Sequence, residues 1–245
     1  MRELRNAFFL ISIITLGVLF SVSVYAEPTG PTNPITPLSS SRFGLSAAQS
    51  TVAIAGNVTE FNLNANSITQ TWQGYFGNIT GKIVLGNSNN NTLYDWTLTN
   101  PQGEIYATRL STVPNWANIA CAGPSDIDSE DAALGVNQSI HKDSVNNTFL
   151  NTTNFPVFYV GSVVINQSSQ NCFATYLYND TGAQSTYFPE VLLTDGSGYI
   201  IYTGLIESNA IGFDGNSHDF QIMVGENGHN GDTATSTYYF YLELE

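Results

Sequence analysis

Apolar residues recur at every second position along much of this chain, which is the period of a β-strand. Val52 and Ile54 begin the pattern, and residues 79–85 and 94–98 continue it. Between the last two stretches lies a run of glycine, asparagine and serine at 86–91. Two alternating stretches around such a turn predict a β-hairpin.

Further strands are predicted along the rest of the chain, at 104–110, 172–178, 191–193, 199–206 and 220–224. The turn around Gly196, at 195–198, predicts that 191–193 and 199–206 form a hairpin. Residues 155–165 are apolar on both faces, which predicts a central, buried strand. In the terminal stretch 235–245, Tyr238, Phe240, Leu242 and Leu244 face one side and the polar or acidic residues, Glu243 among them, face the other. This alternation predicts a half-buried last strand.

The pattern as a whole predicts an all-β protein. Its roughly ten short strands are separated by turns rich in glycine, asparagine and proline, and no repeat or change of composition marks a second domain. No amphipathic helix of ten residues is expected. We therefore predict one antiparallel β-sandwich domain over residues 51–245.

The N-terminus predicts export. Arg2 and Arg5 precede an apolar run at 7–24, and Val24 and Ala26 place small residues at the positions that a signal peptidase reads. This is the pattern of a secretory signal peptide over 1–26. Two alternatives remain: an uncleaved anchor, because about 18 apolar residues just span a bilayer, and a pilin-type leader cut near Ala7. Residues 27–50, rich in proline, serine and threonine, predict an extended tether or a donor arm.

Composition narrows the classes of partner. Six basic residues against twenty acidic ones give a net charge of −14, which excludes electrostatic binding of nucleic acid and attracts cations. Aromatic residues at 12% exclude a disordered chain. Membrane contact is expected only through an uncleaved signal segment.

Export changes the interpretation of the cysteines and asparagines. Cys121 and Cys172 predict one disulfide bond in an oxidising compartment, with two buried free thiols as the alternative. Glycosylation is predicted at eight Asn-x-Ser/Thr sites. They are Asn57, Asn78, Asn90, Asn137, Asn146, Asn151, Asn166 and Asn179.

One acidic cluster suggests a metal. Asp126, Asp128 and Glu130 alternate, and Asp131 follows, so in an extended loop their oxygens would converge on Ca²⁺. The alternative is a short helix that Asp128 caps. The glycine-containing stretches 214–219 and 226–232 also hold oxygen ligands, but turn chemistry explains them without a metal.

The sequence predicts no catalytic residues and no enzyme. His141, His218 and His229 lie in no metal-binding spacing, and no G-x-S-x-G elbow is present. Paired carboxylates for glycoside hydrolysis converge only in space, so the sequence does not test them.

The tryptophans offer a different chemistry. Trp72, Trp96 and Trp116 could stack sugars on an aromatic platform, although Trp96 lies on an apolar strand face and is predicted to be core.

Parts of the chain carry a resemblance. Residues 71–96 (TWQGYFGNITGKIVLGNSNNNTLYDW), GEIYATR at 103–109 and the terminal TYYFYLELE resemble a group of uncharacterised secreted archaeal proteins. No functional residues carry over from that group. More loosely, the order of leader, tether and Asn/Thr-rich sandwich is similar to archaeal surface-filament subunits, which polymerise by donor-strand complementation. The resemblance implies a donor arm at 35–54, of which only the part after Pro37 pairs well, because proline donates no backbone hydrogen bond.

We therefore expect an extracellular, cell-surface structural or adhesive protein, in its sharpest form a filament subunit assembled by strand addition and aided by Ca²⁺. Its expected partners are copies of itself or other surface proteins. The alternatives are a carbohydrate-binding surface module and, third, a secreted enzyme of unknown activity.

Overall fold

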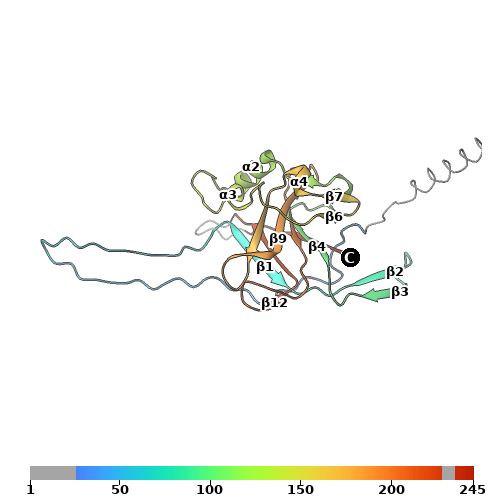
Figure 1. The fold of residues 1–245 in the computed structure, drawn as a ribbon, viewed down its shortest axis with the longest axis horizontal. Coiled ribbons are helices and arrows are strands. Elements are labelled where there is room, and N and C mark those ends of the chain that lie inside the picture. The colour runs from blue at the N-terminus through green and yellow to red at the C-terminus, as the bar shows by residue number, and fades with distance from the viewer. Residues whose placement is uncertain (1–25, 228–234) are drawn as a thin grey trace, which may run out of the picture.

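The computed structural model describes residues 26–227 and 235–245 (Figure 1). The predicted signal peptide, apart from Ala26, lies outside the described residues. Within the described ranges, no helix is both long and apolar enough to span a bilayer.

One six-stranded antiparallel sheet forms the centre of the molecule. Its path runs β14 (Tyr239–Leu244), β4 (Gly103–Thr108), β10 (Ile201–Leu205), β9 (Gln184–Thr194) and β5 (Ala120–Cys121), and β8 (Ala174–Tyr178) also pairs with β9. The β9–β10 pair is joined by the turn predicted around Gly196. The long strand β9 pairs with β10, β5 and β8, so it organises the sheet.

Four two-stranded antiparallel sheets and four short helical segments surround this sheet. The strand pairs are β1 (Trp72–Gly77) with β13 (Phe220–Gly225), β2 (Lys82–Gly86) with β3 (Thr92–Thr97), β6 (Phe158–Val160) with β7 (Val163–Ile165), and β11 (Ala210–Ile211) with β12 (Ser217–His218). The helical segments are η1 (Trp116–Asn118), α2 (Pro124–Ala133), α3 (Val145–Thr148) and α4 (Gln167–Gln170). The predicted all-β class is confirmed, with fourteen strands in the described part of the chain.

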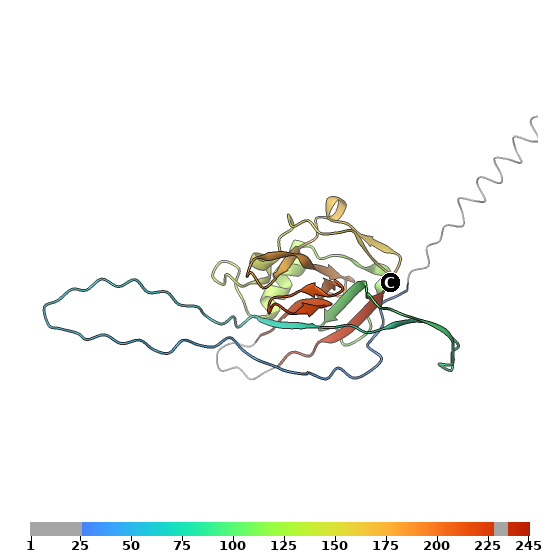
Figure 2. The same cartoon turned by 60° about the horizontal axis from the view of Figure 1, so that its bottom comes forward.

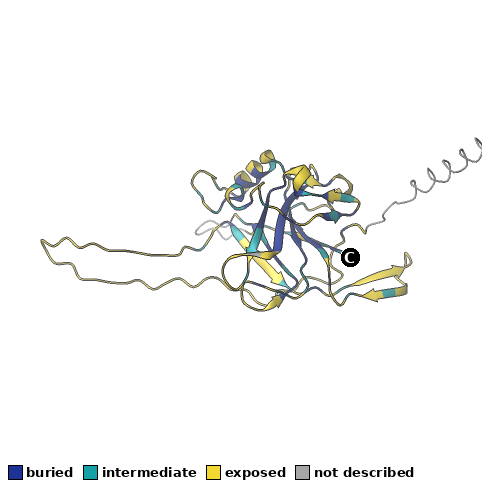
Figure 3. Cartoon of the chain, in the orientation of Figure 1, coloured by how far each residue is buried: buried dark blue, intermediate teal, exposed yellow. Residues whose placement is uncertain are grey.

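A hydrophobic core lies on each face of the central sheet, because neighbouring residues of a strand point to opposite faces. Val191 and Leu193 contribute to one core, and Leu192 between them contributes to the other. The β6–β7 hairpin covers the first core. Strand β13 with α2 and α3 covers the second. Figure 3 shows the resulting dark-blue centre.

Two strand predictions were wrong. Val52 and Ile54 form no strand, and the first strand begins at Trp72. Residues 155–165 do not form one central strand but contain the β6–β7 hairpin. The chain reverses at Gly161, whose φ of +54° is a left-handed conformation that glycine adopts without strain.

The helix α2 was not predicted at its observed length of ten residues. Its buried side chains are Ile127, Glu130 and Asp131, and the buried Leu134 follows. This spacing is that of one helix face. Because two of the four residues are carboxylates, the helical stripe does not appear in a hydrophobicity pattern.

Candidate functional site

A long segment before β1 is exposed throughout. Every residue from 30 to 67 is exposed, and none of them belongs to a strand or helix. We call residues 30–67 the arm. Just before it, Thr29 exchanges two backbone hydrogen bonds with Leu242 of β14, of 2.9 and 2.8 Å. The arm therefore starts at the central sheet and ends at β1 without contributing to either core.

The arm runs out from the body and returns, as Figures 1 and 2 both show. A tight turn lies in it, where the amide of Asn57 donates to the carbonyl of Ile54 at 3.2 Å and Gly56 has a φ of +82°. Large apolar side chains on both sides of this turn are between 56% and 91% exposed, namely Val52, Ile54, Phe61 and Leu63.

A second exposed apolar surface lies on the predicted β2–β3 hairpin, which is confirmed. In its register, Ile83 is opposite Trp96 and Leu85 is opposite Tyr94. We call these four side chains the hairpin face. They are between 42% and 60% exposed. The rings of Tyr94 and Trp96 contact each other with centroids 5.0 Å apart, and the other face of the hairpin carries the Lys82–Asp95 ion pair.

The prediction that Trp96 is a core residue was wrong, because its side chain is 50% exposed. The other two tryptophans are packed. Trp116 is buried against the rings of Tyr106 and Tyr241. Trp72 is half-buried against Phe149, and its Nε1 donates a hydrogen bond to a backbone carbonyl. The three tryptophans therefore do not form one platform.

The arm and the hairpin project from opposite ends of the body. In Figures 1 and 2 the blue-to-teal arm extends from one end, and β2 and β3 extend from the other. Figure 3 shows both in yellow, beside the dark-blue body. A single copy therefore presents two separated apolar surfaces.

The acidic cluster lies on α2 rather than in an extended loop. The helix begins at Pro124, and the Asp126 carboxylate accepts a hydrogen bond from the amide of Gly123 at 2.8 Å. The predicted alternative placed the start of the helix at Asp128, but this residue lies within α2, where it is exposed and accepts from Gln138.

The other two carboxylates of the cluster are buried and have other partners. Glu130 forms an ion pair with Arg109 and accepts a hydrogen bond from the hydroxyl of Tyr202. Asp131 accepts from the amide of Val145 at 2.7 Å, which ties α2 to α3. The structure therefore does not bring the four predicted ligands together. Across residues 26–227 and 235–245, no group of three or more His, Cys, Asp or Glu side chains could hold a metal.

The glycine-containing stretch 214–219 is held by its own side chains. Asp214 accepts hydrogen bonds from Asn216 and contacts the ring of His218, which together lower the pKa of its carboxyl to about 2. The Asp219 carboxylate accepts from the amide of Ile79 at 2.8 Å. Most of the stretch 226–232, including His229, lies outside the described residues.

A buried pair of glutamates was missed by the sequence analysis. Glu104 of β4 lies directly opposite Glu243 of β14, and each is at most 3% exposed. Glu243 accepts hydrogen bonds from the Tyr106 hydroxyl at 3.0 Å and the Gly161 amide at 2.9 Å. In contrast, Oε2 of Glu104 has no partner. Glu243 was predicted on the polar face of the last strand, and both faces of that strand are in fact covered.

Burial raises the pKa of both carboxyl groups. Desolvation, followed by the charges of Glu243 and Glu245, raises the pKa of Glu104 to about 9. Desolvation raises the pKa of Glu243 to about 7, although hydrogen bonds from Gly161 and Tyr106 oppose the shift. Because each side chain is at most 3% exposed, the pair is not a surface that a substrate can contact.

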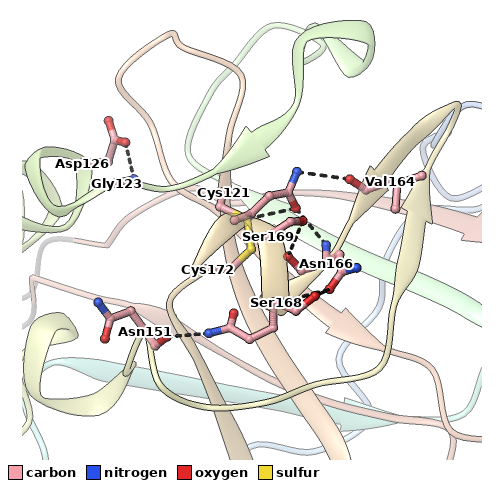
Figure 4. Close-up of a disulfide and its surroundings, with 11 residues drawn as sticks. Cys121, Gly123, Asp126, Asn151, Val164, Asn166, Ser168, Ser169 and Cys172 are labelled. Atoms are coloured by element: carbon pink, nitrogen blue, oxygen red, sulfur yellow. Dashed lines mark hydrogen bonds between the residues drawn. A yellow bond between two sulfur atoms is a disulfide. The ribbon is translucent and has the colours of Figure 1, made fainter.

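The predicted disulfide is present. Cys121 of β5 is bonded to Cys172, just before β8, with their Cα atoms 4.9 Å apart and a sequence separation of 51 (Figure 4). Both strands pair with β9. The bond therefore joins two elements that already meet on the same central strand.

None of the eight predicted glycosylation sites is buried. Five asparagines are exposed and three are partly buried, the latter being Asn146, Asn166 and Asn179. The side-chain oxygens of Asn166 and Asn179 accept from the backbone amides of Ser168 and Thr181 in their own sequons. Glycosylation at all eight sites stays a prediction.

Comparisons with known proteins add no family to this description. No protein-family model, curated protein or solved structure matches the chain.

Proposed function

We propose that this chain is an exported structural protein of a cell surface, and that its copies assemble non-covalently through the arm. The observation that supports this proposal is the number of large apolar side chains that the arm exposes. They are Ile35, Leu38, Phe43, Leu45, Val52, Ile54, Val58, Phe61 and Leu63.

Such exposure is costly for a protein that stays monomeric. Soluble monomers rarely expose contiguous apolar surface beyond a few hundred Å², and larger patches mark interaction sites. The arm is also extended, so its backbone amides and carbonyls can extend a neighbour's sheet while its side chains fill pockets. Its prolines at 31, 34 and 37 lie in its first part, and no proline follows until Pro101. Residues 38–67 are therefore all able to donate ladder hydrogen bonds.

Assembly is tested on the full chain exported from its producing cell. Light scattering coupled to size-exclusion chromatography would measure its mass across protein concentrations, ionic strengths and Ca²⁺ concentrations, and electron microscopy would show its form. A ladder of oligomers or filaments supports the proposal. A strict monomer under every condition contradicts it.

An arm variant makes this test specific. Phe61→Ser with Leu63→Ser removes two exposed apolar side chains and is expected to lower the assembled fraction at least tenfold. The matched control is Ser46→Thr, which changes an exposed polar position of the same arm. Equal assembly of the Phe61/Leu63 variant and the control would contradict the role of the arm.

Carbohydrate binding is the second candidate function, and the exposed rings of Tyr94 and Trp96 favour it. Aromatic faces that are open to solvent can stack on sugar rings through their C–H groups. Quenching or enhancement of tryptophan fluorescence on titration with glycans, lost in Trp96→Ala, would support this function. A glycan array without any signal would exclude it for the glycans displayed.

A further inference from the structure

We propose that the hairpin face of one copy receives the apolar side of the arm of the next copy, so that copies join head to tail. This inference rests on the proposed function, in that copies assemble through the arm, and names the surface that accepts it. The contact is face-to-face packing of side chains, in place of the addition of a strand to a neighbour's sheet.

The turn in the arm determines which of its side chains share a face. If antiparallel pairing continues from the Ile54–Asn57 hydrogen bond, residue 52 lies opposite 59, 50 opposite 61, and 48 opposite 63. Val52, Ile54, Phe61 and Leu63 then lie on one side of a two-stranded ribbon, because side chains alternate across a strand. Polar residues predominate on the other side, which carries Gln49, Thr51, Glu60, Asn62 and Asn64. The arm thus carries the pattern of an amphipathic ribbon that lacks a surface to pack on.

The hairpin face is a complementary surface. It is also one side of a two-stranded ribbon, and it presents two aliphatic and two aromatic side chains. An isolated hairpin is at best marginally stable in water, so burial of this face stabilises the hairpin as well as the contact. Two such ribbons pack about 10 Å apart, as sheets do in a sandwich.

Charge favours the same pairing. The chain as a whole has a net charge of −14, which makes most surfaces of two copies repel each other. The arm contains only Arg42 and Glu60 as charged residues, and the hairpin with its flanks at 81–98 contains only Lys82 and Asp95. Both segments are therefore neutral, and they approach each other without that repulsion.

Position decides between a contact within one copy and a contact between copies. The arm and the hairpin extend from opposite ends of the body (Figures 1 and 2). Two different surfaces at opposite ends make a heterologous contact, which leaves one of each free after every addition. The expected product is an open chain of copies rather than a closed dimer.

Other exposed aromatic residues are less suited to accept the arm. Tyr75 and Phe76 of β1 are also exposed, but their rings already contact Phe240 and Phe213 of the same copy, with centroids 5.3 and 5.0 Å apart. In contrast, the ring contact of Tyr94 and Trp96 lies within the hairpin face itself.

Two variants, each defective at one end, test the inference. The arm variant is Val52→Ser with Phe61→Ser, and the hairpin variant is Leu85→Ser with Trp96→Ser. Each is expected to be monomeric alone, with the dissociation constant raised at least tenfold. An equimolar mixture is expected to form dimers and no longer species, because the intact hairpin of one variant accepts the intact arm of the other. Val84→Ser, on the opposite side of the same hairpin, is the control and is expected to assemble as the wild type does.

The outcomes separate this inference from the proposed function. If the wild type and the hairpin variant assemble equally while the arm variant does not, the hairpin face is not the acceptor and assembly through the arm stands. If the wild type never assembles, both fail. Loss of glycan binding in the hairpin variant, with assembly unchanged, would assign the face to carbohydrate instead.

Hydrogen exchange provides a readout that does not depend on the folding of the variants. On assembly of the wild type, the amides of β2, β3 and residues 51–63 are expected to exchange more slowly than in the dilute monomer. Unchanged exchange in β2 and β3 on assembly would overturn the inference.

Discussion

The central sheet and the two ends of the molecule use the same sequence pattern with opposite results. Alternating apolar residues in β9 are buried on both faces because β13, α2 and the β6–β7 hairpin cover them. The same alternation in the arm and in β2–β3 stays exposed, and neither segment pairs with a strand of another described sheet. The comparison teaches that alternating apolar residues specify a surface that can be buried. Whether it is buried depends on other segments, distant in sequence or in another copy, that pack against it.

The largest expected difference between the two regions is in how much free energy of unfolding is lost when a phenylalanine in each is replaced by alanine. Phe149→Ala removes a fully buried ring of the second core and is expected to lower the free energy of unfolding by about 3–5 kcal/mol. Phe61→Ala, in the arm, is expected to change it by less than about 0.5 kcal/mol. Denaturant unfolding of the monomer measures both, and equal losses would show that the arm packs against the body.

Removal of the disulfide is expected to weaken the body by a similar amount. In the chain-entropy model, a bond that closes a loop with a sequence separation of 51 contributes roughly 4 kcal/mol. Cys121→Ala with Cys172→Ala should therefore lower the unfolding midpoint in denaturant. Assembly at temperatures where this variant is folded should match that of the wild type. A loss of assembly from the folded variant would contradict the separation of the two regions.

The buried glutamates make the body sensitive to pH. The pKa values of Glu104 and Glu243 are raised to about 9 and about 7 from 4.5, so the folded state binds more protons than the unfolded state does. Stability from this pair is therefore greatest below about pH 4.5 and falls as the pH rises. The fall is at most about 1.4 kcal/mol per pH unit for each group, and it ends near pH 7 for Glu243 and near pH 9 for Glu104.

The variant Glu104→Gln tests this pH dependence. It removes one titrating group and is expected to flatten the fall in unfolding free energy between pH 5 and 9. Glu60→Gln, in the exposed arm, is the matched control and should leave the curve of the wild type unchanged. Parallel curves for the wild type and Glu104→Gln would contradict the raised pKa of Glu104.

The smallest expected effect on stability follows cleavage of the arm. Chymotrypsin should cut first at exposed apolar residues such as Phe43 and Phe61, before any site in the body, because unpaired backbone enters a protease readily. The free energy of unfolding of the cut protein should differ from that of the intact protein by less than about 0.5 kcal/mol. Mass spectrometry identifies the cuts, and a first cut within β9 or β10 would refute this order.

Local patterns predicted the strands that have local causes. The β2–β3 hairpin followed from an asparagine-rich turn between alternating stretches, and the β9–β10 pair followed from the turn around Gly196. The disulfide followed from two cysteines and a signal for export.

The errors arose where burial depends on distant segments. Trp96 lies in an apolar pattern, but its side chain is 50% exposed and its ring contacts Tyr94 of the same exposed hairpin. Conversely, the structure buries three glutamates, although glutamate is usually a surface residue. Strand pairing places Glu104 and Glu243 inside, and the ion pair with Arg109 accompanies the burial of Glu130. The candidate acceptor surface could therefore not be found from the sequence, although the arm could be partly anticipated from its prolines.

The arm and the hairpin project from opposite ends of the body, yet along the chain they directly flank β1. A pull between the two ends therefore runs along the covalent backbone of this six-residue strand. Because the arm also starts beside β14, at Thr29, and the hairpin continues into β4, part of the same pull passes through the central sheet. In a chain of copies, load would thus be carried within each copy by covalent backbone and by the most buried strands, and the weakest element under tension would be the contact between copies.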